Sequence, residues 1–339
     1  MNLSTRASLP FLVVVSLLSL TGCSKPAAIQ SGPRLVIAIG GQAQIGYLPT
    51  TLAAQLGHYR DEGLEVELLD FAGGSKALEA LFGGSADVVS GYFDHTVQMA
   101  AEGKPLRSFV SMLRYPGLAL VVSPGTSRKI SSIRDLAGST VGVSAPGSST
   151  HLLLNHLLVR NGLQPDSVSA VGVGMAAGAV AAMESGKVDA AVMAEPGISQ
   201  LRARKGELRF LADTQSRRGV LDVYGVSTYP AAVLYSRTEW VEKNQILAKR
   251  LARAMRRTLA WIQAHSPEEI AARMPEAMRG GDLTLYTKAI ENSKDRFSPD
   301  GILEDEAAQA VVRVLSESLD RVRIAKPDVR QCYTNQFVE

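Results

Sequence analysis

Short apolar runs alternate with longer segments of helical period along most of the chain. The first stretch predicts strands at residues 35–39, 64–70 and 86–89, separated by helices at 49–59 and 75–82. A second stretch repeats this order, with strands at 140–143, 167–173 and 188–193 and helices at 148–160 and 176–183. Each stretch is a β-α-β-α-β unit whose parallel strands are joined by right-handed crossovers. The pattern predicts an α/β protein.

The two stretches also share short motifs in the same order. The segment ALEALFGGSADVV aligns with AVAAMESGKVDAA, which pairs Gly84 with Gly186 and Asp87 with Asp189. Glycine suits the left-handed end of a helix, and aspartate suits the turn into the next strand. The tripeptide EGL of the first stretch likewise matches NGL of the second. We interpret the stretches as two copies of one unit.

Two such units predict two lobes, each built on an open sheet, with a ligand cleft between them. Ligands of open α/β sheets bind beyond the carboxyl ends of the strands. The expected cleft walls are loops 40–47, 72–76 and 90–94 of the first lobe and 144–150, 174–177 and 194–197 of the second.

The chain is expected to cross between the lobes twice, which makes a hinge. A Pro/Gly break at 122–127, directly after a strand predicted at 118–122, marks the first crossing, and residues 225–229 mark the second. A strand at 232–235 and helices at 239–264, 267–274, 283–292 and 304–319 then complete the first lobe. The first lobe is therefore assigned to residues 34–123 and 228–339, and the second to residues 124–227.

The N-terminus predicts export and a lipid anchor. Residues 11–20 (FLVVVSLLSL) follow Arg6 and form an apolar run that is too short to span a bilayer but suits a signal peptide. The run ends in Leu-Thr-Gly-Cys, which resembles the bacterial lipobox, so we predict a signal peptide at 1–22 and lipidation (palmitate) at Cys23. Residues 23–33 then form a flexible tether. An ordinary signal peptide with an incidental cysteine is the alternative.

Composition narrows the function. The formal net charge is only +3 and the chain has no dense Lys/Arg stripe, which argues against a nucleic-acid partner. The other cysteine is Cys332, so a fold in an oxidising compartment must depend on its core rather than on a disulfide. With 46% hydrophobic residues, the chain is long enough for two lobes with separate cores.

Several polar residues of the expected cleft suit an anionic ligand. Ser148, Ser149 and Thr150 precede an apolar helix, where free N–H groups and hydroxyls can bind a sulfonate, phosphate or carboxylate. The alternative is that one hydroxyl merely caps the helix. Gly74 and Ser75 offer the same arrangement in the first lobe.

Other side chains suggest different contacts. Arg114 is able to pair with a ligand anion through its guanidinium fork, or to remain a solvated charge at a strand end. Tyr47 and Tyr92 are able to wall a flat ligand or simply to pack the lobe surface. Asp94 and Glu195 favour a ligand with an amino or hydroxyl donor, although Glu195 alternatively bonds nearby backbone at the hinge.

Catalytic motifs are missing from the sequence. Neither Gly-Gly-Ser segment completes G-x-S-x-G, and no P-loop is present. His151 and His156 are five residues apart and do not share a helical face, and no His/Cys/Asp cluster has zinc spacing. We predict no catalytic residue, no metal and no cofactor.

The ordered motifs YLP, LGHYRDEGLEVEL, FAGGSKALEAL, GGSADV, IRDLAGSTVGV, APGSST, MESGKVDAAVMAEP and RFSPDG resemble the taurine/nitrate/sulfonate-type substrate-binding proteins. That family also contains thiamine-pyrimidine precursor binders. The resemblance covers the chain from Leu35 onward. It implies a type II periplasmic-binding fold and delivery of a small ligand to an ABC permease with its own ATPase.

The resemblance places the ligand on the segments that match the family, which are residues 42–47 (with Gln42), 73–76, 91–94, 146–150 and 195–196. The cysteine-rich catalytic segment of the related yeast thiamine-pyrimidine synthase has no counterpart here, so we expect a non-enzymatic monomer in the periplasm or at the cell surface. The preferred ligand is a small organic anion. The alternatives are a pyrimidine-like heterocycle held by Asp94 or Glu195, and a sensor role in place of import.

Overall fold

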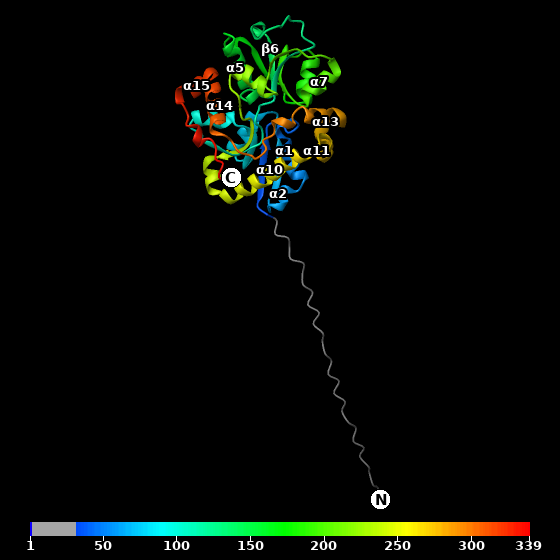
Figure 1. Ribbon diagram of the computed structural model, residues 1–339, viewed down its shortest axis with the longest axis vertical. Helices are drawn as coiled ribbons and strands as arrows, with labels where there is room; N and C mark the ends of the chain where they lie inside the picture. The colour runs from blue at the N-terminus through cyan, green and yellow to red at the C-terminus, as the bar shows by residue number, and fades with distance from the viewer. Residues whose placement is uncertain (2–31) are drawn as a thin grey trace. The chain divides into compact units, whose positions relative to one another are not determined.

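The computed structural model describes Met1 and residues 32–339. The predicted signal peptide, Cys23 and most of the predicted tether lie outside these residues. The described chain contains two five-stranded sheets. Figure 1 draws the second sheet at the top, around β6, and the first sheet below it.

The first sheet has the spatial strand order β2-β1-β3-β10-β4. Its strands are β1 (Arg34–Ile39), β2 (Glu65–Asp70), β3 (Val88–Tyr92), β4 (Leu106–Ser111) and β10 (Ala232–Arg237). β1, β2 and β3 are parallel, and β10 runs antiparallel to both β3 and β4. The helices between the first four strands are α1 (Leu48–Gln55), α2 (His58–Asp61), α3 (Gly74–Phe82) and α4 (Asp94–Ala101).

The second sheet repeats this topology in the order β7-β6-β8-β5-β9. Its strands are β5 (Leu118–Val122), β6 (Thr140–Val143), β7 (Ser169–Gly172), β8 (Ala190–Ala194) and β9 (Phe210–Asp213). β6, β7 and β8 are parallel, while β5 is antiparallel to β8. The associated helices are α5 (Ser149–Arg160), α6 (Ala177–Glu184), α7 (Gly197–Lys205) and α8 (Arg217–Tyr224). β5 therefore occupies the place that β10 has in the first sheet.

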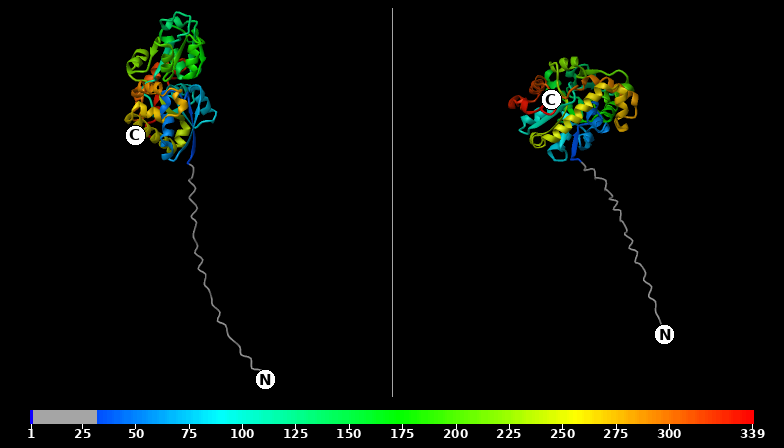
Figure 2. Two further views of the ribbon diagram at one scale, coloured as in Figure 1. Left: turned by 90° about the vertical axis from the view of Figure 1, so that its right-hand side faces the viewer. Right: turned by 60° about the horizontal axis from the view of Figure 1, so that its bottom comes forward.

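The C-terminal part is helical and belongs mainly to the first lobe. It contains α9 (Thr238–Lys243), α10 (Gln245–Ala264), α11 (Pro267–Arg273), α12 (Glu276–Arg279), α13 (Leu283–Glu291), α14 (Asp305–Ser318) and α15 (Asp320–Ala325). The long helix α10, yellow in Figure 2, packs on α1 and α2. α14 contacts both α4 and α5, and α13 contacts α7, so these helices touch the second lobe at two places.

The paired motifs have the same role in both sheets. Gly84 and Gly186 adopt φ angles of 78° and 68°, as expected for glycine at a helix end. The carboxylate of Asp87 accepts the backbone N–H of Val36 in β1 at 2.8 Å, and that of Asp189 accepts the N–H of Thr140 in β6 at 2.9 Å. Each aspartate thus ties the third parallel strand to the first, which supports a duplicated unit.

The predicted strands and helices occur in the predicted order, but α4, α7, α8 and β9 were not predicted. One predicted strand was also assigned to the wrong lobe. β5 pairs with β8 and β9 in the second sheet, so the chain changes lobes before this strand and not at 122–127. All five residues of β5 are buried, and a continuous apolar run indicates a buried strand without indicating its sheet. We call residues 112–117 the first crossing and residues 225–231 the second crossing.

Two predicted helices are each interrupted. Gly57 adopts φ 78° and divides the helix predicted at 49–59 into α1 and α2. Asn244, with φ −117° and ψ 38°, separates α9 from α10. Both residues leave the helical region of φ/ψ space, which apolar periodicity alone does not reveal.

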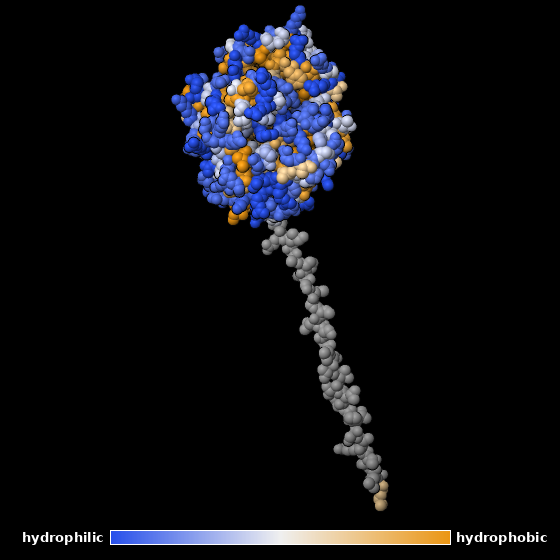
Figure 3. All heavy atoms as spheres, in the orientation of Figure 1, coloured by the Kyte–Doolittle hydropathy of each residue, from blue (hydrophilic) through white to orange (hydrophobic). Residues whose placement is uncertain are grey.

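The face of the described chain drawn in Figure 3 is largely hydrophilic, with apolar patches. Among residues 32–339, no helix has the length and apolar character needed to cross a membrane.

Removing the two equivalent carboxylates should destabilise both lobes. We expect Asp87→Ala to lower the free energy of unfolding by about 1–3 kcal/mol, because a part-buried N–H loses its acceptor. Asp189→Ala should cost more, since Asp189 also accepts from Thr126 at 2.7 Å. The control is Asp166→Ala, at an exposed residue. Urea unfolding measures the free energy of unfolding of the three variants. Equal stability of Asp87→Ala and the control would contradict the assigned role.

Candidate functional site

Loops at the carboxyl ends of the parallel strands of both lobes meet around a small cavity of about 10 Å³. The cavity is lined by Gly40, Gln44, Tyr47, Gly74, Tyr92, Leu118, Ser144, Ser148, Ser149 and Thr150. Six of these residues are among the predicted site residues: Tyr47, Gly74, Tyr92, Ser148, Ser149 and Thr150. The loops therefore converge where the topology of open α/β sheets places a ligand site.

A buried carboxylate lies at the boundary of the two lobes. Asp94, the first residue of α4, is 3% exposed, and its Oδ1 accepts the hydroxyl of Ser149 at 2.7 Å. Burial raises the pKa of Asp94 above its ordinary value, although His95 and the Ser149 hydrogen bond oppose the shift. Ionising this buried carboxyl group is costly, so the resulting carboxylate is a strong acceptor for a hydrogen-bond donor in the cleft.

His95 lies directly beside this carboxylate. Its side chain is fully buried, and Nδ1 lies 3.2 Å from the hydroxyl of Tyr235. Nε2 has no hydrogen-bond partner in the described chain. Burial lowers the pKa of His95, so the imidazole is neutral at pH 7 and does not cancel the charge of Asp94.

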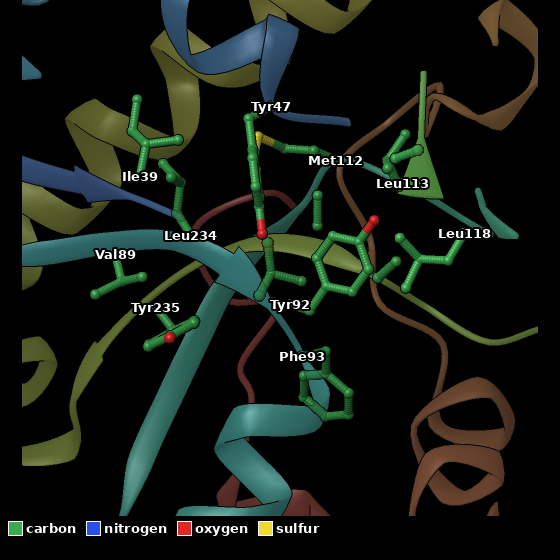
Figure 4. Close-up of a cluster of buried hydrophobic side chains, with 14 of the residues drawn as sticks. Ile39, Tyr47, Val89, Tyr92, Phe93, Met112, Leu113, Leu118, Leu234 and Tyr235 are labelled. Atoms are coloured by element: carbon green, nitrogen blue, oxygen red, sulfur yellow. The ribbon is translucent and has the colours of Figure 1, made fainter. Parts of the chain in front are cut away.

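The charge of Asp94 acts on several buried tyrosines. Tyr47 and Tyr92 meet edge to face, with ring centroids 5.8 Å apart. Tyr92 lies at the end of β3 and Tyr47 in the short helix Ile45–Tyr47, and Figure 4 shows both side chains. Tyr224 and Tyr229 stack at 4.4 Å. Burial, with a further contribution from the charge of Asp94, raises the pKa of four buried tyrosines: Tyr47, Tyr224, Tyr229 and Tyr235. The acid is therefore set among aromatic surfaces.

The hydroxyls at the start of α5 are engaged by the protein. Ser148 accepts the backbone N–H of Ser75 at 3.0 Å and donates to its hydroxyl at 3.0 Å. Thr150 accepts the N–H of Ser144 at 2.9 Å. Ser75 donates to the carbonyl of Pro146 at 2.9 Å. These side chains connect the lobes in the described conformation.

Five predicted site residues do not line the cavity: Gln42, Ser75, Asp94, Arg114 and Glu195. Arg114 is exposed and donates to the carbonyl of Asp295 at 2.5 Å. Gln42 donates through its side chain to Thr51 at 2.9 Å. Glu195 is buried, and both of its carboxylate oxygens accept from Ser199, at 2.9 Å each, which corresponds to the backbone-bonding alternative for this residue.

Three buried residues were not predicted from the sequence as candidates for the site. Tyr224 and Tyr229 lie close to the second crossing, which was interpreted only as a connection between the lobes. Arg296 is 4% exposed and lies at the first crossing, within the RFSPDG motif. The signal available for Arg296 was this motif, whose position relative to the cleft depends on long-range packing.

Among residues 32–339, no group of three or more His, Cys, Asp or Glu side chains is arranged to hold a metal ion. Cys332 is fully buried, its Sγ lies 3.8 Å from the carbonyl of Thr96, and burial raises its pKa to about 12. This thiol is protonated at neutral pH and is a poor nucleophile.

Comparison with known proteins identifies the family. A family model described as NMT1/THI5 like matches residues 44–270. The chain belongs to this family. A solved structure from Bordetella bronchiseptica RB50 is 38% identical, covers 90% of this chain and 95% of its own, and has a TM-score of 0.87.

Members and neighbours of the family differ in function. The alkanesulfonate-binding protein SsuA from Xanthomonas axonopodis pv. citri, solved with bound MOPS, is 17% identical, covers 89% of this chain and 98% of its own, and has a TM-score of 0.69. The 4-amino-5-hydroxymethyl-2-methylpyrimidine phosphate synthase of Legionella pneumophila is 25% identical across 86% of this chain and 88% of its own length. The family resemblance and the type II periplasmic-binding fold are thereby confirmed. The lipobox stays a prediction.

The buried acid should make stability depend on pH. Because the pKa of Asp94 is raised from 3.8 in the folded protein, ionisation above that pH favours the unfolded chain. Asp94→Asn should therefore stabilise the ligand-free protein, and its advantage should grow as pH rises from about 4 and level off above the folded pKa. Urea unfolding at a series of pH values measures this gap. Asp166→Asn is the control, and a gap that narrows with rising pH would contradict the assignment.

Proposed function

We propose that this protein is the solute-capturing component of an ABC importer and has no enzymatic activity of its own. We further propose that its solute contains a flat nitrogen heterocycle with an N–H donor edge. The single observation that carries this proposal is the carboxylate of Asp94, which is buried and accepts the hydroxyl of Ser149 across the boundary between the lobes.

The hydrogen bond between the lobes indicates what Asp94 accepts. Ser149, from the second lobe, supplies its hydroxyl to the carboxylate at 2.7 Å. A ring amino group or ring N–H is the same kind of donor and is able to replace that hydroxyl. An acceptor-only carboxylate repels an anionic group placed at the same point.

The aromatic residues favour a flat ligand. Tyr47 and Tyr92 of the first lobe pack edge to face, and Tyr224 stacks on Tyr229 at the second crossing. A planar heterocycle gains offset-stacked or edge-to-face contacts with such rings. The synthase from Legionella pneumophila carries a substituted pyrimidine in its name, which supports this class of solute.

Capture requires the lobes to separate first. A cavity of about 10 Å³ is far smaller than the roughly 300–1,000 Å³ of typical ligand pockets. The lobes are held together by direct bonds, including the N–H of Ile45 to the carbonyl of Glu195 at 2.9 Å. A solute must therefore replace these bonds with better ones to favour a closed complex.

The remaining parts of the proposal concern location and partners. We propose that the chain is exported, lipidated at Cys23 and held as a monomer in the periplasm or at the cell surface, where it meets a permease with its own ATPase. A lipid-anchored sensor would have the same fold and the same cleft. Solute uptake in a deletion strain distinguishes the two roles, because only the importer component is required for uptake.

Binding of an aminopyrimidine should depend on the acid. Asp94→Asn should weaken binding by about tenfold or more, because a charged hydrogen bond contributes roughly 1.5–3 kcal/mol. Asp166→Asn should bind like the wild type. Isothermal titration calorimetry with an aminopyrimidine, the same ring without its amino group, and an alkanesulfonate measures the preference. Equal affinity of the wild type for both rings, or undiminished affinity of Asp94→Asn for the aminopyrimidine, would refute the proposed contact.

Lipidation is tested separately. Cys23→Ser should abolish incorporation of labelled palmitate and release the protein from the membrane fraction. Cys332→Ser is the control and should remain membrane-bound. Release of neither variant from the membrane would rule out Cys23 as the anchor.

A further inference from the structure

A buried arginine with few partners lies where the chain first passes between the lobes. Arg296, the last residue of the short helix Lys294–Arg296, is 4% exposed. Its carbonyl accepts the backbone N–H of Arg114 at 2.8 Å, and the adjacent Phe297 pairs with Leu113. The side chain is therefore held against the first crossing.

The guanidinium of Arg296 is poorly satisfied. Its Nη2 donates to the hydroxyl of Ser293, while Nε has no partner, and Arg296 forms no ion pair within the described chain. Glu195 and Asp213 attract its charge from a greater distance, but each of these carboxylates already accepts a backbone N–H in the second lobe. Burial lowers the pKa of Arg296 in spite of both acids, so desolvation outweighs the attraction.

The arginine lies next to the cavity wall. Gly117 has φ 66°, and a Cβ there would overlap the guanidinium of Arg296. The next residue, Leu118, lines the cavity, and so does Tyr92, whose hydroxyl donates to the carbonyl of Pro116 at 2.6 Å. Figure 4 shows Tyr92 facing Leu118.

Tyr92, which lines the cavity, is affected by two opposite charges. The charge of Arg296 lowers the pKa of Tyr92 and the charge of Asp94 raises it, in addition to the larger effect of burial. Both charged groups are therefore close to the same ring. Tyr92 is thus influenced by the acid of α4 and by the guanidinium that lies against Gly117 of the first crossing.

We propose that Arg296 is the binding partner of an anionic oxygen group (a carboxylate, sulfonate or phosphate) carried by the solute. A charge removed from water without a partner destabilises the protein, and buried charges are normally paired. A guanidinium with unused donors beside a ligand cavity is suited to a bidentate contact with such an anion. Together with the proposed function, on which this step rests, the solute is a heterocycle that has a hydrogen-bond donor and an acidic substituent.

The decisive experiment compares two probes that differ only in the anionic group. They are 4-amino-5-hydroxymethyl-2-methylpyrimidine and its phosphate monoester, titrated into wild type, Arg296→Gln, Arg296→Lys and Arg114→Gln. We expect the wild type to prefer the phosphate by about tenfold or more, as for other charged hydrogen bonds. Arg296→Gln should reduce the preference to within about twofold and leave affinity for the neutral ring unchanged. Arg296→Lys should retain part of the preference, and Arg114→Gln should retain all of it.

The melting temperature of the ligand-free variants separates a binding role from a structural one. An arginine kept for ligand binding lowers the stability of the ligand-free protein, because its buried charge has no partner there. Arg296→Gln should therefore melt at the same temperature as the wild type or higher. A lower melting temperature together with equal loss of both probes would overturn the proposal, and so would an unchanged preference for the phosphate.

A solute that contains no heterocycle would give a different result in these titrations. If the wild type binds neither ring, inorganic phosphate and an alkanesulfonate are titrated into the same variants. Binding of either anion that is lost in Arg296→Gln and kept in Arg114→Gln would support Arg296 as the anion partner while removing the heterocycle. Absence of anion binding to the wild type would overturn the inference.

Discussion

The two crossings are hydrogen-bonded to each other, and the arrangement of the lobes depends on this contact. The backbone N–H groups of Met112 and Leu113 both donate to the carbonyl of Ala232, at 2.7 and 3.1 Å, and the N–H of Ala231 donates to Leu113 at 3.1 Å. β5 and β10, which follow the crossings, each supply the antiparallel strand next to a parallel trio. Neither sheet is complete without a strand that the chain reaches by a crossing, so the lobes cannot separate without keeping this pair of segments together.

This constraint also fixes the chemistry of the cleft. Tyr92 on β3 and Leu118 on β5 line the cavity, and Arg296 lies against Gly117 of the first crossing. α4 and α5 supply the hydrogen-bonded pair Asp94 and Ser149. Most charged side chains of the described chain are exposed, where ion pairs contribute little. Asp94 and Arg296 are exceptions because both are buried and neither forms an ion pair within the described chain. Two opposite charges that are kept apart and dry are suited to a ligand with a donor at one end and an anion at the other.

Local sequence patterns predicted the strands, the duplicated unit and most of the cavity lining. Gly84 and Gly186 act at their own helix ends, so short-range chemistry is sufficient to recognise them. The lobe of β5 and the choice between Arg114 and Arg296 are different, because both depend on contacts between distant segments. An arginine at a strand end and one after a distant helix are equivalent in a linear pattern, and only the fold decides which of them is removed from water.

Gly117 combines two requirements in one position. It allows a backbone angle that other residues rarely adopt, and its missing side chain leaves room for the guanidinium of Arg296. A substitution there would disturb the passage between the lobes and displace the arginine at the same time. Divergence towards a new solute is therefore expected to proceed through residues outside the two crossings, such as Tyr224.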